Sequence, residues 1–229
     1  MSSRIMKMLP LYILNLFIMQ PGLGIASDTG YEVEIIIFED ATGRYENSED
    51  WSYNDMLNNR ESNNLDSNPE PDSEFKELEW GDSSLNDSLE RIKSNDNYNI
   101  LVNKRWKQTG LDRDAAYSIY VSSYEPVTSH SNEISSSDTI TEVSATPDSY
   151  INGEVKLVMS RYLHFEVNLM YHKKIIESDM STEQYVSYPV VAERRMRSRE
   201  IHYLDHPMIG VIVYTVPYEI PTEIEKKSQ

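Results

Sequence analysis

The sequence predicts an α+β protein, in which a mostly antiparallel sheet carries one or two helices on one face and a long acidic loop insertion. Segments that alternate apolar and polar residues recur along the chain, as half-buried strands do. One segment, between residues 85 and 92, instead shows apolar residues at helical spacing. Residues 43–72 are rich in Asn, Ser, Asp and Glu and contain few large aliphatic residues. Such a composition predicts a mobile acidic loop, because it cannot bury enough apolar area to offset the entropy of ordering.

The first ordered elements are a strand and a helix. Residues 31–38 alternate at first and then become continuously apolar, which predicts a strand that enters a core. The helix is expected where Leu85, Leu89 and Ile92 recur at helical spacing. Asp82 or Ser84 could cap its N-terminus.

Three further segments predict most of the sheet. Residues 98–107 form one predicted strand, and residues 116–124, rich in Tyr, Ile and Val, form another. Residues 155–171 predict a long alternating strand or a bent pair of strands. The odd positions of this last segment form the expected buried face, with Val155, Leu157, Met159, Leu163, Phe165, Val167, Leu169 and Tyr171.

The C-terminal third predicts a strand, a turn and a second strand. The strand is expected over residues 194–204, the turn at residues 205–207 and the apolar return strand over residues 208–216. Residues 126–149 form a Ser/Thr-rich run without Lys or Arg, which predicts a surface loop or linker. Residues 218–229 are expected to be a flexible tail, so that residues 27–217 form a single domain.

The first 26 residues have the layout of a cleaved secretory signal peptide. Arg4 and Lys7 give a short basic start, and residues 8–19 form an apolar run that is too short to span a bilayer. Gly24 and Ala26 then supply the small residues of a cleavage site. We therefore expect export from the cytosol with removal of this segment.

The composition excludes several functions. The chain has 21 Lys and Arg, 38 Asp and Glu and a net charge of −17. Loss of Arg4 and Lys7 with the signal peptide would change the net charge from −17 to −19. Such a chain is not expected to bind nucleic acid or to dock on an anionic membrane, and no later segment predicts stable membrane insertion. The absence of Cys excludes a lipid-anchored Cys, a cysteine nucleophile and thiolate metal ligands.

Three arginines alternate along the predicted strand of residues 194–204. Arg195, Arg197 and Arg199 would point to the same face at intervals of about 6.6 Å. Guanidinium groups bind carboxylates in a bidentate manner, so this row could bind an anionic ligand such as the carboxylates of peptidoglycan stem peptides. Ion pairing with acidic residues of the protein itself is an equally good interpretation.

Two other residues stand out by their surroundings. Arg161 occupies an odd position of the predicted strand over residues 155–171, where a buried arginine requires a ligand or a structural partner such as Glu34 or Asp205. Trp106 lies among Lys104, Arg105 and Lys107, and an indole ring suits amphipathic ligands such as sugars.

No catalytic or metal signature is present in the sequence. His202 and His206 flank Asp205 and would share a strand face, but no third ligand follows at a telling spacing. No zinc-protease, nucleophile-elbow or P-loop motif occurs. A glycosidase pair of carboxylates leaves no sequence signature, so a wall hydrolase is an alternative, as is a protein–protein adaptor. We expect no cofactor.

Several blocks of the sequence resemble the CsiV family of periplasmic peptidoglycan-binding proteins. The longest is Arg194–Pro207, followed by Gly210 and an apolar strand that reaches Pro217. Weaker blocks are Arg161–His164 and Tyr31–Phe38, together with the segment from Tyr98 to Gln108. Asn103 and Thr109 depart from the family pattern, in which His and Pro are expected.

The resemblance implies a non-enzymatic accessory protein that binds peptidoglycan and supports cell-wall synthesis and cell shape. It also implies a partner, a lipoprotein that activates a bifunctional penicillin-binding protein. The residues expected to contact peptidoglycan are Trp106, Arg161, Tyr162, His164, Arg195, Arg197, Arg199, His202, Tyr203, Asp205 and His206.

Overall fold

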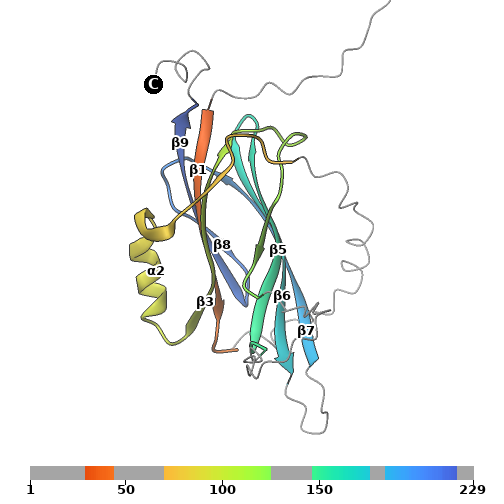
Figure 1. Cartoon of the computed structure of the whole chain (residues 1–229). Helices are drawn as coiled ribbons and strands as arrows, with labels where there is room; N and C mark the ends of the chain where they lie inside the picture. The colour runs from red at the N-terminus through yellow and green to blue at the C-terminus, as the bar shows by residue number, and fades with distance from the viewer. Residues whose placement is uncertain (1–28, 44–69, 125–145, 176–183, 221–229) are drawn as a thin grey trace, which may run out of the picture.

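The computed structural model describes residues 29–43, 70–124, 146–175 and 184–220. These residues form two antiparallel sheets that pack face to face, with one α-helix on the outside (Figure 1). The predicted signal peptide, most of the acidic loop and most of the Ser/Thr-rich segment lie outside the described residues. No helix of the described residues is long and apolar enough to cross a membrane.

The first sheet has five strands, and β1 (Thr29–Asp40) is its centre. β1 pairs with β3 on one side and with β9 on the other, and the short strands β2 and β8 form the edges. The bounds of the other four strands are Lys76–Leu78 for β2, Tyr98–Thr109 for β3, His202–Asp205 for β8 and Ile209–Glu219 for β9.

The second sheet has four strands in chain order. It consists of β4 (Ile119–Ser122), β5 (Ser149–Met159), β6 (Leu163–Ile175) and β7 (Gln184–Met196). β5 and β6 form an antiparallel hairpin, because residues 160–162 turn the chain back on itself. Of the two predictions for residues 155–171, the bent pair of strands is therefore the one observed. The predicted buried face is confirmed on both strands, although Met159 is only partly buried.

The main core lies between the two sheets. Odd residues of β1, such as Val33 and Ile35, enter this core together with Trp106 from β3. Odd residues of β5 and β6, such as Leu157 and Phe165, meet them from the second sheet. Because successive side chains of a strand point to opposite faces, alternate residues of both sheets meet in one apolar layer.

The helix α2 (Asn86–Lys93) covers the other face of the first sheet. Leu85 and Leu89 pack on Ile36 and Phe38, which are even-numbered residues of β1. β1 is therefore buried on both faces, which explains why its sequence becomes continuously apolar.

The N-terminus of α2 is held by a carboxylate from the sheet. The N-cap residue is Leu85, and no side-chain cap comes from Asp82 or Ser84, so the predicted cap is wrong. Instead Glu34 of β1, only 1% exposed, accepts hydrogen bonds from the Ser83 hydroxyl at 2.8 Å and the Leu85 amide at 3.1 Å. The Arg105 Nε lies 3.6 Å from the same carboxylate, so the buried charge has a partner.

A second buried carboxylate links the two sheets. Glu39 of β1 accepts hydrogen bonds from the Tyr171 hydroxyl at 2.7 Å and the Ser149 hydroxyl at 2.5 Å, both from the second sheet. Asn99 of β3 donates a third, at 2.7 Å. Three donors offset the cost of removing this carboxylate from water.

The C-terminal third differs from the prediction. The single strand expected over residues 194–204 is wrong, because β7 ends at Met196 in one sheet and β8 begins at His202 in the other. The predicted turn at residues 205–207 is present, and the return strand extends to Glu219, beyond the expected domain end at residue 217. β2 and most of β7 were not predicted, whereas α2 was.

We expect replacement of Glu34 by alanine to reduce the free energy of unfolding by about 3 kcal/mol, because Arg105 and the helix amides lose a buried partner. Urea denaturation measures the change. The control is Glu77→Ala, since Glu77 is 62% exposed and pairs with Lys104 at the surface; this change should cost under about 1 kcal/mol. Equal losses for the two variants would contradict this role of Glu34.

Candidate functional site

Most of the predicted site residues separate into two groups at opposite ends of the first sheet, whereas Trp106, Arg199 and His202 belong to neither group. One group surrounds the β5–β6 turn and the end of β7, near the start of β1, where the Tyr31 hydroxyl reaches the Met159 sulfur. The other lines a hollow at the end of β1, where the chain turns from β8 into β9. The 12 residues of β1 separate the two ends by roughly 36 Å.

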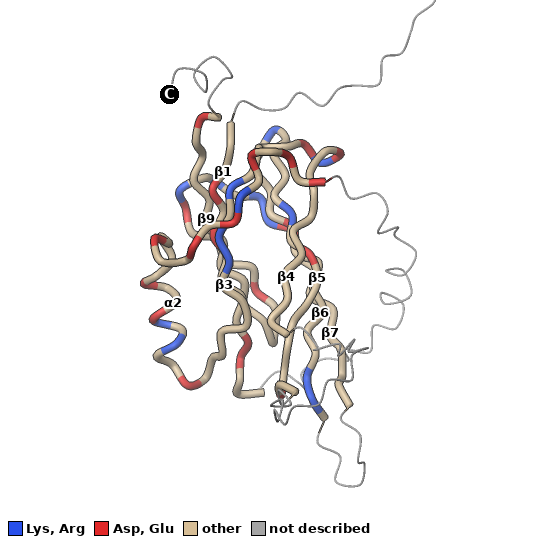
Figure 2. Tube along the Cα trace, in the orientation of Figure 1, with Lys and Arg blue, Asp and Glu red and all other residues tan. Residues whose placement is uncertain are grey.

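The first group is an arginine cluster, which we define as Arg161, Arg195 and Arg197 with the ring of Tyr162. Arg195 lies opposite His164 in the pairing of β6 and β7. The Arg195 guanidinium carbon lies 3.3 Å from the centroid of the Tyr162 ring, which is a cation–π contact. Figure 2 shows many Lys, Arg, Asp and Glu segments at this end of the molecule.

Nearby carboxylates are engaged mainly by other groups. Glu193 accepts a hydrogen bond from Arg113 at 2.8 Å and lies 2.8 Å from the His164 Nδ1. The bond from Arg113 lowers the pKa of the Glu193 carboxyl below its ordinary value, and His164 adds to the effect. Glu166 also pairs with Arg113.

The arginines of the cluster keep accessible surface. The Arg197 side chain is 81% exposed, and its contact with Glu200 is long, at 3.8 Å. Arg161 and Arg195 are exposed, and neither forms an ion pair within the described part of the chain. The cluster can therefore offer guanidinium groups to an external carboxylate.

The expected row of three evenly spaced arginines does not exist. Arg195 belongs to β7, whereas Arg197 and Arg199 follow it in the connection to β8. Arg199 has a φ of 63° and donates its amide to the Thr215 carbonyl at 2.8 Å. The His202 Nε2 lies 3.0 Å from the Arg197 amide nitrogen and 3.1 Å from its carbonyl oxygen, so His202 supports this connection rather than facing a ligand.

Two further expectations are corrected by burial. Arg161 is exposed in the β5–β6 turn and is not on the buried face, because the chain reverses there instead of continuing as one strand. Trp106 is fully buried between the sheets, and its indole donates to Gln108 at 2.8 Å. Trp106 therefore stabilises the core and is not accessible to a wall ligand.

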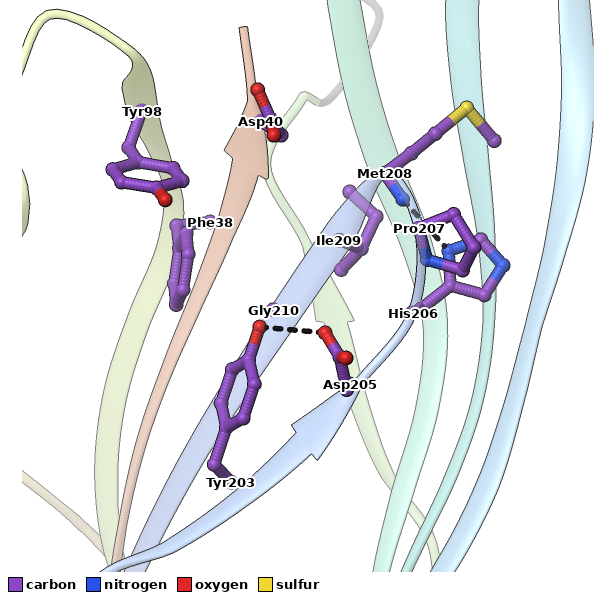
Figure 3. A pocket seen from close by; sticks show the side chains of 10 residues that line it. All are labelled: Phe38, Asp40, Tyr98, Tyr203, Asp205, His206, Pro207, Met208, Ile209 and Gly210. Atoms are coloured by element: carbon purple, nitrogen blue, oxygen red, sulfur yellow. Dashed lines mark hydrogen bonds between the residues drawn. The ribbon is translucent and has the colours of Figure 1, made fainter. Parts of the chain in front are cut away.

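The second group lines the hollow shown in Figure 3. Phe38, Tyr98 and Tyr203 form a row of rings that crosses the outer face of the first sheet. The Phe38 ring meets Tyr98 edge to face at 5.4 Å and lies nearly parallel to Tyr203 at 6.3 Å between centroids. Gly210 permits this arrangement, because a Cβ there would come within 2.3 Å of the Phe38 ring.

Polar groups complete the hollow. The Tyr203 hydroxyl donates to Asp205 at 2.9 Å, and burial followed by this bond raises the pKa of Tyr203. Burial lowers the pKa of His206 below its ordinary value, and Asp205 opposes this shift only in part. Among the described residues, no group of three His, Asp or Glu side chains could hold a metal ion.

The comparison with family models gives a match over residues 9–218 to the family described as "Peptidoglycan-binding protein, CsiV". The chain belongs to the CsiV family. The match confirms the resemblance seen in the sequence blocks. Neither the comparison with curated proteins nor the comparison with solved structures gives a match.

The C-terminal CsiV block is thus divided among the arginine cluster, the connection between the sheets and the hollow. Several residues of both groups were not predicted, because their roles depend on strand pairing; these are Phe38, Asp40, Tyr98, Arg113 and Glu193. Phe38 and Asp40 follow the alternation of β1, but only the fold shows that this end of β1 lies beside the block.

We expect the His206 imidazole of this CsiV-family chain to titrate below about pH 6.5, the ordinary value for histidine. The unfolded chain would then bind a proton at higher pH than the folded chain, so stability should fall as pH drops through that value. NMR titration of the His206 ring measures the pKa, and His206→Asn should reduce the loss of stability. A pKa above 6.5 would show instead that attraction by Asp205 dominates over burial.

Proposed function

We propose that this protein is a non-enzymatic periplasmic accessory protein that binds peptidoglycan and supports cell-wall synthesis in a Gram-negative bacterium. The observation that carries the proposal is the match of the CsiV family model over residues 9–218. The family description names peptidoglycan as the ligand, and the proposal extends this property to the present chain. The signal peptide expected at residues 1–26 supports export.

The arginine cluster supports the proposal through its chemistry. Peptidoglycan stem peptides carry free carboxylates, and guanidinium groups bind carboxylates through paired, charge-assisted hydrogen bonds. Arg161, Arg195 and Arg197 are exposed at one end of the β-sandwich, in a protein whose net charge is −17. A local cationic surface on an acidic protein favours a small or dispersed anion over a polyanion such as nucleic acid.

Tyr162 makes this cluster more rigid than isolated surface arginines. Its ring, 43% exposed, supports the guanidinium of Arg195 and leaves part of its own surface open to a ligand. A long side chain that is already ordered loses less entropy on binding. An aromatic ring beside cationic groups also suits the sugar and peptide portions of the wall.

The finer role in the cell is part of the same proposal. We infer that the protein works beside a lipoprotein activator of a bifunctional penicillin-binding protein, as the CsiV resemblance implies. Retention of the protein on the wall would place it where newly made strands are inserted. It would bind the polymer without cleaving it.

We predict that the purified protein sediments with isolated sacculi and that this binding weakens as salt concentration rises, because the contacts are ionic. The double variant Arg195→Glu and Arg197→Glu should bind at least tenfold more weakly, since each attraction becomes a repulsion. The bound fraction after centrifugation measures the effect. No soluble muropeptides should be released from the sacculi.

The matched control is Arg91→Glu with Lys93→Glu in the last turn of α2, which makes the same change in net charge at another exposed surface. Circular dichroism should show that both variants fold. The proposal fails if the wild type remains in the supernatant at low salt. If both double variants weaken binding to sacculi equally, the arginine cluster is not the binding surface. Release of muropeptides would instead favour a wall hydrolase.

A further inference from the structure

We infer that the hollow at the end of β1 binds a primary ammonium group, which in the wall is the free amino group of an uncross-linked stem peptide. This inference rests on the proposed function, because it names the part of peptidoglycan that a second surface would recognise. The hollow occupies about 360 Å³ and lies at the opposite end of β1 from the arginine cluster. Its rings and its charges both favour an ammonium group.

The aromatic row gives the hollow a surface that attracts cations. The faces of aromatic rings carry negative electrostatic potential, and they bind ammonium groups within about 6 Å of the ring centroid. Phe38 forms the centre of the row, and Tyr98 and Tyr203 flank it (Figure 3). Phe38 is only 8% exposed, so the ring that a ligand can reach most readily from solvent is that of Tyr203, which is 43% exposed.

Two carboxylates add negative charge to the hollow. Asp40 and Asp205 line it, and none of its lining residues is Lys or Arg. The Tyr203 hydroxyl orients Asp205 through a hydrogen bond at 2.9 Å. A carboxylate has about four acceptor positions, so this bond leaves Asp205 able to accept further hydrogen bonds from an ammonium group.

His206 does not neutralise these carboxylates near pH 7. Its imidazole lies at the edge of the hollow, and burial lowers its pKa. The hollow therefore keeps an acidic character under the conditions of the periplasm.

A metal ion fits this hollow less well than an ammonium group. Within the described chain, no three His, Asp or Glu side chains converge, whereas a divalent cation requires several such ligands. An ammonium group needs only a few hydrogen-bond acceptors and an aromatic surface. A stem peptide loses its free amine when that amine is cross-linked, so the hollow would distinguish free stem peptides from cross-linked ones.

The experiment uses a soluble disaccharide-peptide with one free amine and the same compound after acetylation, which removes the positive charge. Isothermal titration calorimetry with the purified protein should show at least tenfold weaker binding of the acetylated compound, as the loss of a hydrogen bond to a charged group requires. Asp205→Asn should remove this difference. The control Asp87→Asn, at an exposed position of α2, should keep it.

Equal affinity for the two compounds would overturn the inference, and so would a difference that persists in Asp205→Asn. Acetylation changes the ligand and not the protein, so the first comparison holds even if a variant fails to fold. Binding to sacculi without binding to the soluble compound would reject the ammonium site and leave the proposed function in place. A protein that binds neither sacculi nor the soluble compound would reject both the ammonium site and the proposed function.

Discussion

The burial of β1 on both faces fixes the rest of this structure. Its odd residues enter the layer between the two sheets, and its even residues from Glu34 to Asp40 lie beneath α2 or line the hollow. The two buried carboxylates of the strand tie it to its surroundings. Glu34 holds the N-terminus of the helix, and Glu39 receives hydroxyl groups from the second sheet.

This arrangement determines where ligands can bind. The β5–β6 turn lies near the first residues of β1, and the β8–β9 turn lies near its last residues. The arginine cluster surrounds the first of these turns and the acidic hollow adjoins the second, so the two surfaces lie at opposite ends of β1. The proposed carboxylate-binding surface and the proposed amine-binding surface are thus too far apart to neutralise each other.

The connection between β7 and β8 explains how one continuous sequence block contributes residues to both the arginine cluster and the hollow. Met196 ends β7 in the second sheet, and five residues later Ile201 precedes β8 in the first. The positive φ of Arg199 and the contacts of His202 with the Arg197 backbone shape this crossing. Several residues of the Arg194–Pro207 block therefore form the connection between the two sheets.

The fold could be predicted where periodicity is strong. The alternation of residues 155–171 identified the buried face of β5 and β6, and the spacing of Leu85, Leu89 and Ile92 identified α2. The division into two sheets could not be predicted, because Arg194–Leu204 alternates as one strand does and nothing local marks the crossing. The prediction of an arginine row failed for that reason.

The candidate site was predicted only in part. The predicted arginines, Tyr203 and Asp205 are exposed and His206 is partly buried, so their predicted contact with peptidoglycan stays a prediction. Trp106 is fully buried, because a basic neighbourhood in sequence says nothing about a core position on a strand. Phe38, Asp40 and Tyr98 join the hollow through pairings between strands distant in sequence. Such pairings carry no local signal.

The most direct measurement is the map of amide chemical-shift changes when a soluble uncross-linked muropeptide is added to the isotope-labelled protein. We expect saturable changes at residues 161–164, 194–199 and 203–210, with α2 unaffected. Two results would contradict binding at these two surfaces. One is a set of changes centred on α2, and the other is no change at any of these residues although the protein still sediments with sacculi.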